Sequence, residues 1–196
     1  MPEITAAQVM ELREKTGLGM MTCKEALVAS NGDSEKAVDW LRKKGLDTAG
    51  KRSGRVTKEG AIGSYIHMNG RIGVLVELNC ESDFVARGEV FQQLLKDLCM
   101  QVAATAPRAV SPEDIDANIL AKEREIYASQ VAGKPQGVVD KIVEGKLKKF
   151  FAEHCLLDQP FVKNPDLTVA DVVKAVIAKT GENIAVKRFT RFQLGD

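Results

Sequence analysis

The sequence lacks long apolar runs and has few aromatic or histidine residues. Of its 196 residues, 5% are aromatic and two are histidine. No stretch of about 18 consecutive apolar residues occurs, which argues against a membrane-spanning helix. The first residues carry acids and lack the basic and apolar regions of a secretory signal peptide. We therefore expect a cytoplasmic protein with no membrane partner.

An excess of charge of one sign is also missing. The 28 basic residues nearly balance the 27 acidic residues, and the net charge is +1. This balance removes the global electrostatic attraction that is typical of nucleic-acid-binding proteins. The polar segment at 46–59 is locally basic, but no aromatic residue is interleaved to stack on a base. We interpret it as solvated rather than as an RNA contact, and expect no direct nucleic-acid partner.

Cysteine is scarce, and the four cysteines (Cys23, Cys80, Cys99 and Cys155) are far apart with no C-x-x-C pair. That spacing argues against a disulfide framework or a zinc site. No glycine-rich phosphate-binding motif is present. We therefore expect no metal, no cofactor and no catalytic residue. A Cys80–His67 dyad is the enzyme alternative, although no pattern marks Cys80 as an activated thiolate.

What the sequence does contain is clear helix punctuation in its first 45 residues. Thr5 and Thr22 each begin a capping-box pattern, in which a hydroxyl accepts a hydrogen bond from the backbone amide three residues later. Asp33 can cap a third helix that runs to Gly45. Apolar residues at helical spacing give each helix one buried face. The pattern predicts a three-helix module at residues 1–50. Its segment GLGMMTCKEALVASNGDSEKAVDWL, from Gly17 to Leu41, looks like a ubiquitin-associated-type module.

The hydrophobic period changes at Gly60, after a predicted linker at 51–59. Two β-branched runs flank Asn69-Gly70, and Asn-Gly is the strongest short signal of a β-hairpin. Strands are therefore expected at about 60–67 and 71–79.

The remaining residues predict helices and one more strand. A helix at 88–105 should pack on the sheet, and a strongly charged helical hairpin should occupy about 112–155. Thr168 starts a last helix that Gly181 stops, and the alternating segment 184–193 could close a three-stranded sheet. The expected fold class is α+β: residues 60–196 form a small antiparallel sheet packed with helices and carrying the helical hairpin.

The segment CESDFVAR, from Cys80 to Arg87, leaves a strand and enters a helix with an apolar ring beside a carboxylate. One interpretation is structural: Ser82 or Asp83 caps the helix and Phe84 packs on it as a hydrophobic staple. The other is functional: Phe84 projects into a partner's pocket, and Asp83 perturbs a nearby cation or phosphate site. Composition alone leaves both interpretations open.

The adjacent pair Met20-Met21 poses a similar choice. Methionine side chains in such a turn often pack inside a protein. Two adjacent residues cannot both face one core, so at least one should be available to a partner.

The segments LREKTGLGMMTCKEAL (Leu12 to Leu27) and ELNCESDFVAR (Glu77 to Arg87) closely resemble the two signature segments of bacterial translation elongation factor Ts. The likeness extends through GSYIHMNGRIGVLVELN, SPEDI, the GKP turn, EGKLKKF and DQPFV, and so covers nearly the whole chain. The resemblance implies a guanine-nucleotide exchange factor for elongation factor Tu, the GTPase that delivers aminoacyl-tRNA. Such a factor catalyses no covalent reaction.

The resemblance also implies roles for individual residues. The N-terminal module would dock on a helix of the GTPase's nucleotide domain, and Phe84 would insert between partner side chains near the magnesium site, with Asp83 beside it. His67 would contact a neighbouring surface of the partner. The full set of implied contacts to elongation factor Tu is Arg13, Met20, Met21, His67, Asp83 and Phe84.

Three departures from the usual family pattern matter. Ser82 stands where Thr is usual, and Thr22 where Asp is common; each replacement can still cap a helix. The chain also has one core unit where longer members have two. It resembles the short members, which act as homodimers, and pairing could cover a sheet edge and supply the second core.

A competing hypothesis is a ubiquitin-associated-type interaction protein, whose first 45 residues merely tether it to a partner. The two hypotheses differ in the role of Ser82–Phe84, the corner between strand and helix. Exchange activity should depend on this corner, whereas tethering should depend only on the first 45 residues.

Overall fold

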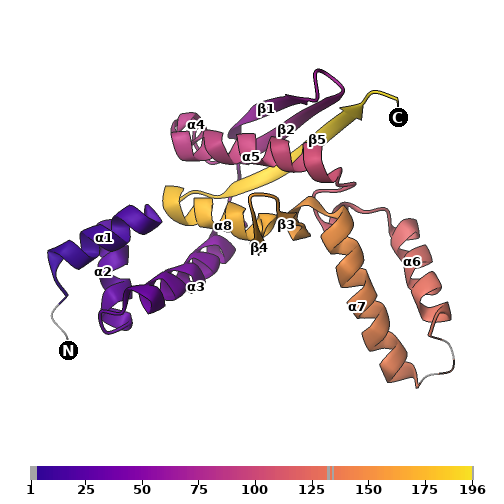
Figure 1. The fold of residues 1–196 in the computed structure, drawn as a ribbon, viewed down its shortest axis with the longest axis horizontal. Coiled ribbons are helices and arrows are strands. Elements are labelled where there is room, and N and C mark those ends of the chain that lie inside the picture. Colours follow the sequence, from indigo (N-terminus) through magenta and orange to yellow (C-terminus); the bar gives the residue numbers. More distant parts are fainter. Residues whose placement is uncertain (1–3, 132, 134, 196) are drawn as a thin grey trace. The chain divides into compact units, whose positions relative to one another are not determined.

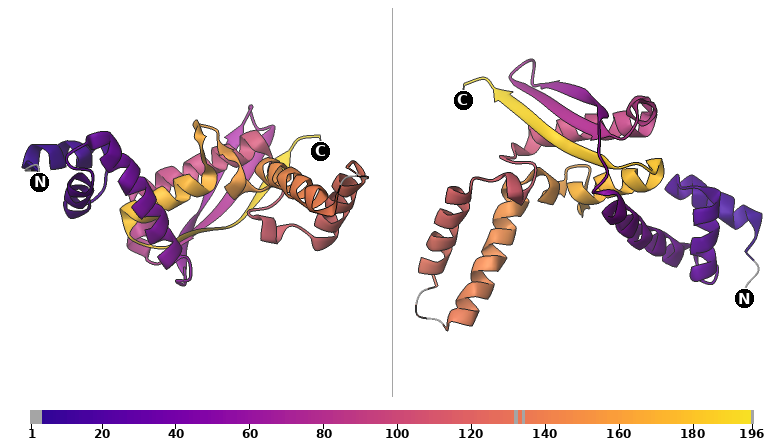
Figure 2. Two further views of the ribbon diagram at one scale, coloured as in Figure 1. Left: turned by 90° about the horizontal axis from the view of Figure 1, so that it is seen from below. Right: turned by 180° about the vertical axis from the view of Figure 1, so that it is seen from behind.

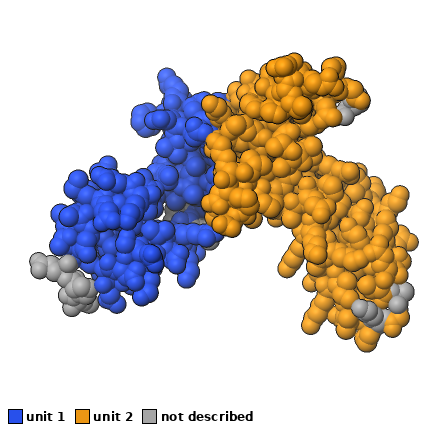
Figure 3. Space-filling model, in the orientation of Figure 1, with its two compact units in different colours: residues 1–61, 79–94, 171–185 blue, residues 62–78, 95–170, 186–196 orange. Residues whose placement is uncertain are grey.

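The computed structural model describes residues 4–131, 133 and 135–195. The chain divides into two compact units: unit 1 comprises residues 1–61, 79–94 and 171–185, and unit 2 comprises residues 62–78, 95–170 and 186–196 (Figure 3). The predicted docking module lies within unit 1.

Unit 1 begins with three helices: α1 (Ala6–Thr16), α2 (Met20–Ala29) and α3 (Ser34–Arg52) (Figure 1). Two of the predicted caps are confirmed, because the Thr5 capping box is formed and the Asp33 side chain accepts from the backbone amide of Lys36. The helices enclose a small core of Val9, Leu12, Cys23, Ala26, Leu27, Ala37 and Leu41, with Ile4, Leu18 and Trp40 against it.

Two details of these helices differ from the prediction. The predicted cap at Thr22 is wrong: extended Gly19 is the N-cap of α2, so the helix takes in the methionine pair and Thr22 lies in its first turn. Helix α3 also continues past Gly45 to Arg52. A Cβ on Gly45 would lie 3.4 Å from the Cβ of Ala178, so packing against this neighbour accounts for a helical glycine that the sequence suggested as an end.

The main sheet has the predicted three strands, β1 (Glu59–His67), β2 (Ile72–Cys80) and β5 (Ile184–Gln193), in the order β1-β2-β5. Asn69 and Gly70 both have positive φ in the turn between β1 and β2, as the Asn-Gly signal requires, and Met68 before them has positive φ as well. The chain is thus an α+β protein with a small antiparallel sheet.

One face of the sheet is covered by α5 (Glu89–Thr105). A Cβ on Gly63 of β1 would lie 2.6 Å from Cγ of Leu95, so the glycine permits close approach of strand and helix within unit 2. Leu98, Cys99 and Val102 of the helix are fully buried, as are Val76 and Leu78 of β2. The predicted packing of this helix on the sheet is confirmed.

The predicted helical hairpin consists of α6 (Ala117–Ser129) and α7 (Gln136–His154), which run side by side in all views (Figure 1, Figure 2). It begins later than expected, because Pro112–Asp114 forms only a 3-10 turn and Asp116 caps α6. No residue of α6 is buried.

The sequence did not predict a two-stranded ribbon, β3 (Pro160–Phe161) with β4 (Asn164–Thr168). The ribbon is held by fully buried Gln101, whose amide nitrogen donates to Gln159 Oε1 at 3.2 Å and to Pro160 O at 3.1 Å. Its Oε1 accepts from the backbone amide of Val162 at 2.8 Å. These partners lie about 60 residues away, so no local pattern could reveal them.

The last helix, α8 (Val169–Thr180), ends at Gly181 with φ +76°, as predicted. No helix among the described residues is long and apolar enough to cross a membrane.

Candidate partner-binding surface

The segment that leaves β2 forms a short helix of its own, α4 (Asp83–Arg87). Ser82 is extended, and its side chain accepts from the backbone amide of Val85 at 3.3 Å, which makes it the N-cap. Val85 and Ala86 face inward and are buried. Phe84 faces the other way with 83% of its surface exposed, so it is not a staple. The structural interpretation is right about the cap and wrong about the ring.

Asp83 is exposed beside Phe84 but is already paired with a basic side chain. Arg87, one turn later in α4, donates to its carboxylate and also, from Nε, to its backbone carbonyl at 3.3 Å. A pair this exposed contributes little to stability. It can therefore open at small cost when another cation approaches.

The corner is anchored to two other segments of unit 1. Glu182, just after α8, accepts from the backbone amides of Glu81 at 3.2 Å and Ser82 at 3.0 Å, and from the Ser82 hydroxyl at 2.6 Å. Glu81 in turn accepts from the backbone amide of Asn183 at 2.7 Å and pairs with Arg55 at 3.5 Å. Asn183 is buried, and its side chain donates to Arg55 O at 2.8 Å.

Acid should weaken this anchor. The Asn183 amide, followed by Arg55, lowers the pKa of Glu81 from its usual 4.5. A lowered folded-state pKa gives stability that is present above the unfolded pKa and is lost as pH falls through the folded one. Glu81→Gln should therefore make the free energy of unfolding fall less steeply below about pH 4.5 in denaturant titrations.

Asp158 supplies the control for that measurement, because burial, followed by Glu113, raises its pKa. Asp158→Asn should change the acid dependence in the opposite direction. If both substitutions changed the acid dependence of unfolding in the same direction, the lowered pKa assigned to Glu81 would be contradicted.

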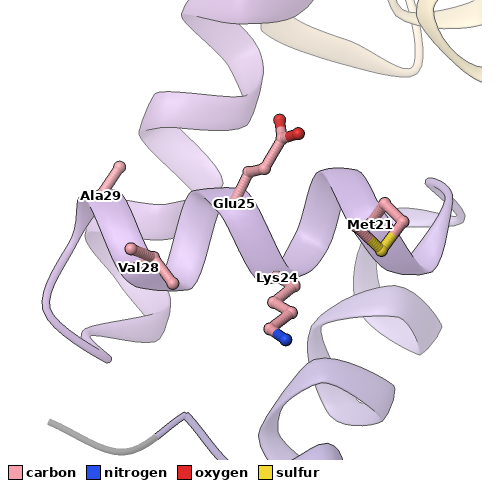
Figure 4. A pocket seen from close by; sticks show the side chains of 5 residues that line it. All are labelled: Met21, Lys24, Glu25, Val28 and Ala29. Atoms are coloured by element: carbon pink, nitrogen blue, oxygen red, sulfur yellow. The ribbon is translucent and has the colours of Figure 1, made fainter.

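A second exposed apolar surface lies on α2. The sequence predicted that at least one of Met20 and Met21 would be available to a partner. Both are exposed, at 49% and 71%. A shallow groove lies along the helix, lined by Met21, Lys24, Glu25, Val28 and Ala29 (Figure 4). Arg13 is exposed on α1 in the same unit.

His67 is exposed at the end of β1 in unit 2, where its Nδ1 lies 3.0 Å from the hydroxyl of Tyr65 and the two rings stack. The thiol of Cys80 is fully buried and donates to Ser82 O at 3.1 Å. Burial, followed by the charge of Glu182, raises the Cys80 pKa. An activated thiolate needs the opposite shift, so the environment of Cys80 disfavours nucleophilic chemistry.

Comparison with known proteins places these features in a family. A family model described as "Elongation factor TS" matches residues 34–196. "Elongation factor Ts" of Desulfosudis oleivorans is 58% identical over the full length of both chains. The chain belongs to the elongation factor Ts family. "Elongation factor Ts" of Thermodesulfovibrio yellowstonii is 59% identical over 98% of this chain and 96% of its own length, and that of Syntrophus aciditrophicus is 56% identical over 98% and 97%.

In this chain, the sequence pointed to Phe84, Asp83 and the methionine pair but missed the residues that hold the Ser82–Phe84 corner. Glu182 and Asn183 lie about 100 residues from their partners at the corner. The sequence marked Gly181 only as the end of a helix and indicated no role for Glu182 or Asn183. Among residues 4–131, 133 and 135–195, no cluster of His, Cys, Asp and Glu could hold a metal ion.

The cysteines of this chain should resist modification. All four are buried, and burial raises the pKa of both Cys99 and Cys155 to about 11. At pH 8 a thiol with that pKa is about one-thousandth ionised, and the thiolate is the reactive form. The folded protein should therefore react slowly with an aromatic disulfide reagent, and the urea-unfolded protein should react rapidly at all four sites. Rapid labelling of folded Cys80 would revive the enzyme alternative.

Proposed function

We propose that this chain is a guanine-nucleotide exchange factor for elongation factor Tu, which promotes GDP release during translation elongation without covalent chemistry. Membership of the elongation factor Ts family supports this proposal. The observation that carries it is Phe84, a large apolar ring that is 83% exposed on a capped helix next to a carboxylate. Solvent exposure of such a ring has no benefit for the fold itself.

In the proposed mechanism, Phe84 and Asp83 act near the magnesium and phosphate site of the GTPase. If the factor binds the nucleotide-free GTPase more tightly than the GDP-bound form, linkage requires that it lower the affinity of the GTPase for GDP by the same ratio. Burial of one Phe side chain is worth roughly 1.5–3 kcal/mol, about one to two decades in an equilibrium constant. Other contacts must therefore contribute to the coupling.

The docking module at residues 1–50 would supply some of those contacts. Its ubiquitin-associated-like character is part of the proposal, as is the linker at 51–59 before the core at 60–196. The exposed apolar line of Met20, Met21 and Val28 suits an amphipathic helix of the GTPase. Arg13 would add a charged contact, and His67 would reach a separate surface of the partner.

Asp83 would change partners in the complex. In the free protein it pairs with Arg87, so it must release that cation before it can face the magnesium site. Because the pair is exposed and weak, this exchange has a small free-energy cost.

The direct test is the release of a fluorescent GDP analogue from purified elongation factor Tu in the presence of Mg²⁺. The proposal expects a rate that rises with the concentration of this protein and then saturates. Binding to the GTPase without acceleration would contradict exchange and favour the tethering hypothesis. A requirement for free thiols would favour the enzyme hypothesis.

We also propose that the chain forms a homodimer through the sheet face opposite α5. That face carries exposed apolar side chains at alternate strand positions, Ile62 and Ile66 of β1, Leu75 of β2 and Phe192 of β5. A three-stranded sheet with one uncovered apolar face is complementary to a second copy of itself. A dimer mass in sedimentation equilibrium that Phe192→Lys converts to a monomer would support this pairing, and a wild-type monomer would contradict it.

A further inference from the structure

Phe84 is held in place by its backbone rather than by packing of its ring. With 83% of the side chain exposed, few atoms of the protein contact the ring. Helix α4 has only five residues, so it has few hydrogen bonds of its own. The direction in which Phe84 projects therefore depends on how the chain enters α4 at Glu81 and Ser82.

That entry is fixed from outside by one carboxylate. Glu182 accepts three hydrogen bonds there, from the amides of Glu81 and Ser82 and from the Ser82 hydroxyl. Hydrogen bonds to a charged acceptor are stronger and more directional than neutral ones. Because the Ser82 hydroxyl donates its only proton to Glu182, its lone pairs are left to accept from the Val85 amide, which caps α4.

Glu182 is itself held in position. Gly181 adopts φ +76°, a conformation suited to glycine, and so turns the chain directly after α8. The Glu182 backbone amide lies 3.4 Å from the Thr180 hydroxyl, and the next amide, of Asn183, donates to Glu81. The corner and the turn therefore bind each other reciprocally.

We infer that Glu182 is a positioning residue for Phe84 and Asp83, acting on the partner GTPase only through the entry to α4. This inference rests on the proposed exchange function. A purely stabilising carboxylate would affect folding and every activity equally. A positioning carboxylate affects the step that needs Phe84 and has no effect where Phe84 is absent.

The test measures GDP release from elongation factor Tu with wild-type protein, Glu182→Ala, Glu182→Gln, Phe84→Ala and the double variant Glu182→Ala/Phe84→Ala. We expect Glu182→Ala to lower the saturating rate about tenfold, as misplacement of a working group does, while the half-saturating concentration changes about twofold. Glu182→Gln keeps an acceptor oxygen, so its saturating rate should lie between those of the wild-type protein and Glu182→Ala. In the Phe84→Ala background, Glu182→Ala should lower the rate by less than about twofold.

A second measurement follows the corner directly in the free protein. Amide hydrogen exchange at Glu81, Ser82 and Val85 should accelerate in Glu182→Ala, while the amides in the interior of α5 keep their protection. Asp97→Ala is the matched control, because it removes a carboxylate that is ion-paired to Lys163 at 2.7 Å in unit 2. It should leave the rate of GDP release unchanged.

The outcomes separate this inference from the proposed function. No acceleration by the wild-type protein would overturn both. Wild-type acceleration that Glu182→Ala retains would overturn the positioning role alone. An equal loss from Glu182→Ala with and without Phe84 would also overturn it, because Glu182 would then act on the whole fold. If Glu182→Ala is unfolded at the assay temperature, Glu182→Gln and its double variant with Phe84→Ala carry the same comparison.

Discussion

Phe84→Ala is expected to slow exchange on elongation factor Tu by about tenfold or more, because the substitution removes roughly 1.5–3 kcal/mol of apolar burial in the complex. The ring is 83% exposed in the free protein, so its removal leaves no cavity and should not lower stability. Exchange should therefore fall while the thermal unfolding midpoint and the protein's own fold are unchanged.

The measurement compares the saturating rate of fluorescent GDP release with the affinity for the GTPase from a separate binding titration. Val56→Ala is a matched control, since Val56 is also exposed in unit 1, at 71%, but has no proposed contact. A loss of rate with the affinity for the GDP-bound GTPase retained would support Phe84 as the acting group. An unchanged rate would assign the coupling to the docking module and Asp83.

Gln101→Glu is expected to destabilise the fold by about 3 kcal/mol at neutral pH, because it buries a charge beside two acceptors. Gln101 is 0% exposed, and its amide nitrogen donates to Gln159 Oε1 and Pro160 O. A carboxylate cannot make those two bonds and repels both oxygens. The neutral form is favoured in the fold, so the folded-state pKa rises and the charge penalty is lost as pH falls below the unfolded pKa. One of the two acceptors still has no donor, because a carboxylic acid has a single O–H.

Thermal unfolding measures the effect, with an expected fall in the midpoint of about 6–12 °C at pH 7 and a smaller fall at pH 5. Gln130→Glu is the matched control, because Gln130 is exposed at the end of α6 and its side chain bonds to Lys146. Its effect should stay within about 0.5 kcal/mol. Equal shifts from the two substitutions would contradict the role assigned to the buried amide.

Local signals in the sequence predicted much of the fold. The Asn69-Gly70 turn set the β-hairpin, and Thr5 and Asp33 marked two helix starts, because turn and cap preferences arise within four residues. Thr22 failed as a marker. Its capping-box pattern competes with Gly19, whose extended conformation starts α2 three residues earlier.

Long-range packing accounts for the features that sequence could not predict. Gly45 resembles a helix end until Ala178 is placed beside it. Gln101 and Glu182 look like ordinary polar residues, since their partners lie about 60 and 100 residues away. For the candidate site, the sequence indicated the residues that face a partner but not those that hold them.

Unit 1 is built from three separate segments of the chain, and this affects how it forms during synthesis. Within this unit, residues 171–185 hold residues 79–94, because Glu182 accepts hydrogen bonds from Glu81 and Ser82. On a ribosome, chains emerge from the N-terminus and local structure forms first. The corner carrying Phe84 therefore leaves the exit tunnel long before Glu182 exists to hold it. A nascent chain would form helices α1 to α3 early but acquire an ordered Phe84 corner only after Glu182 has emerged.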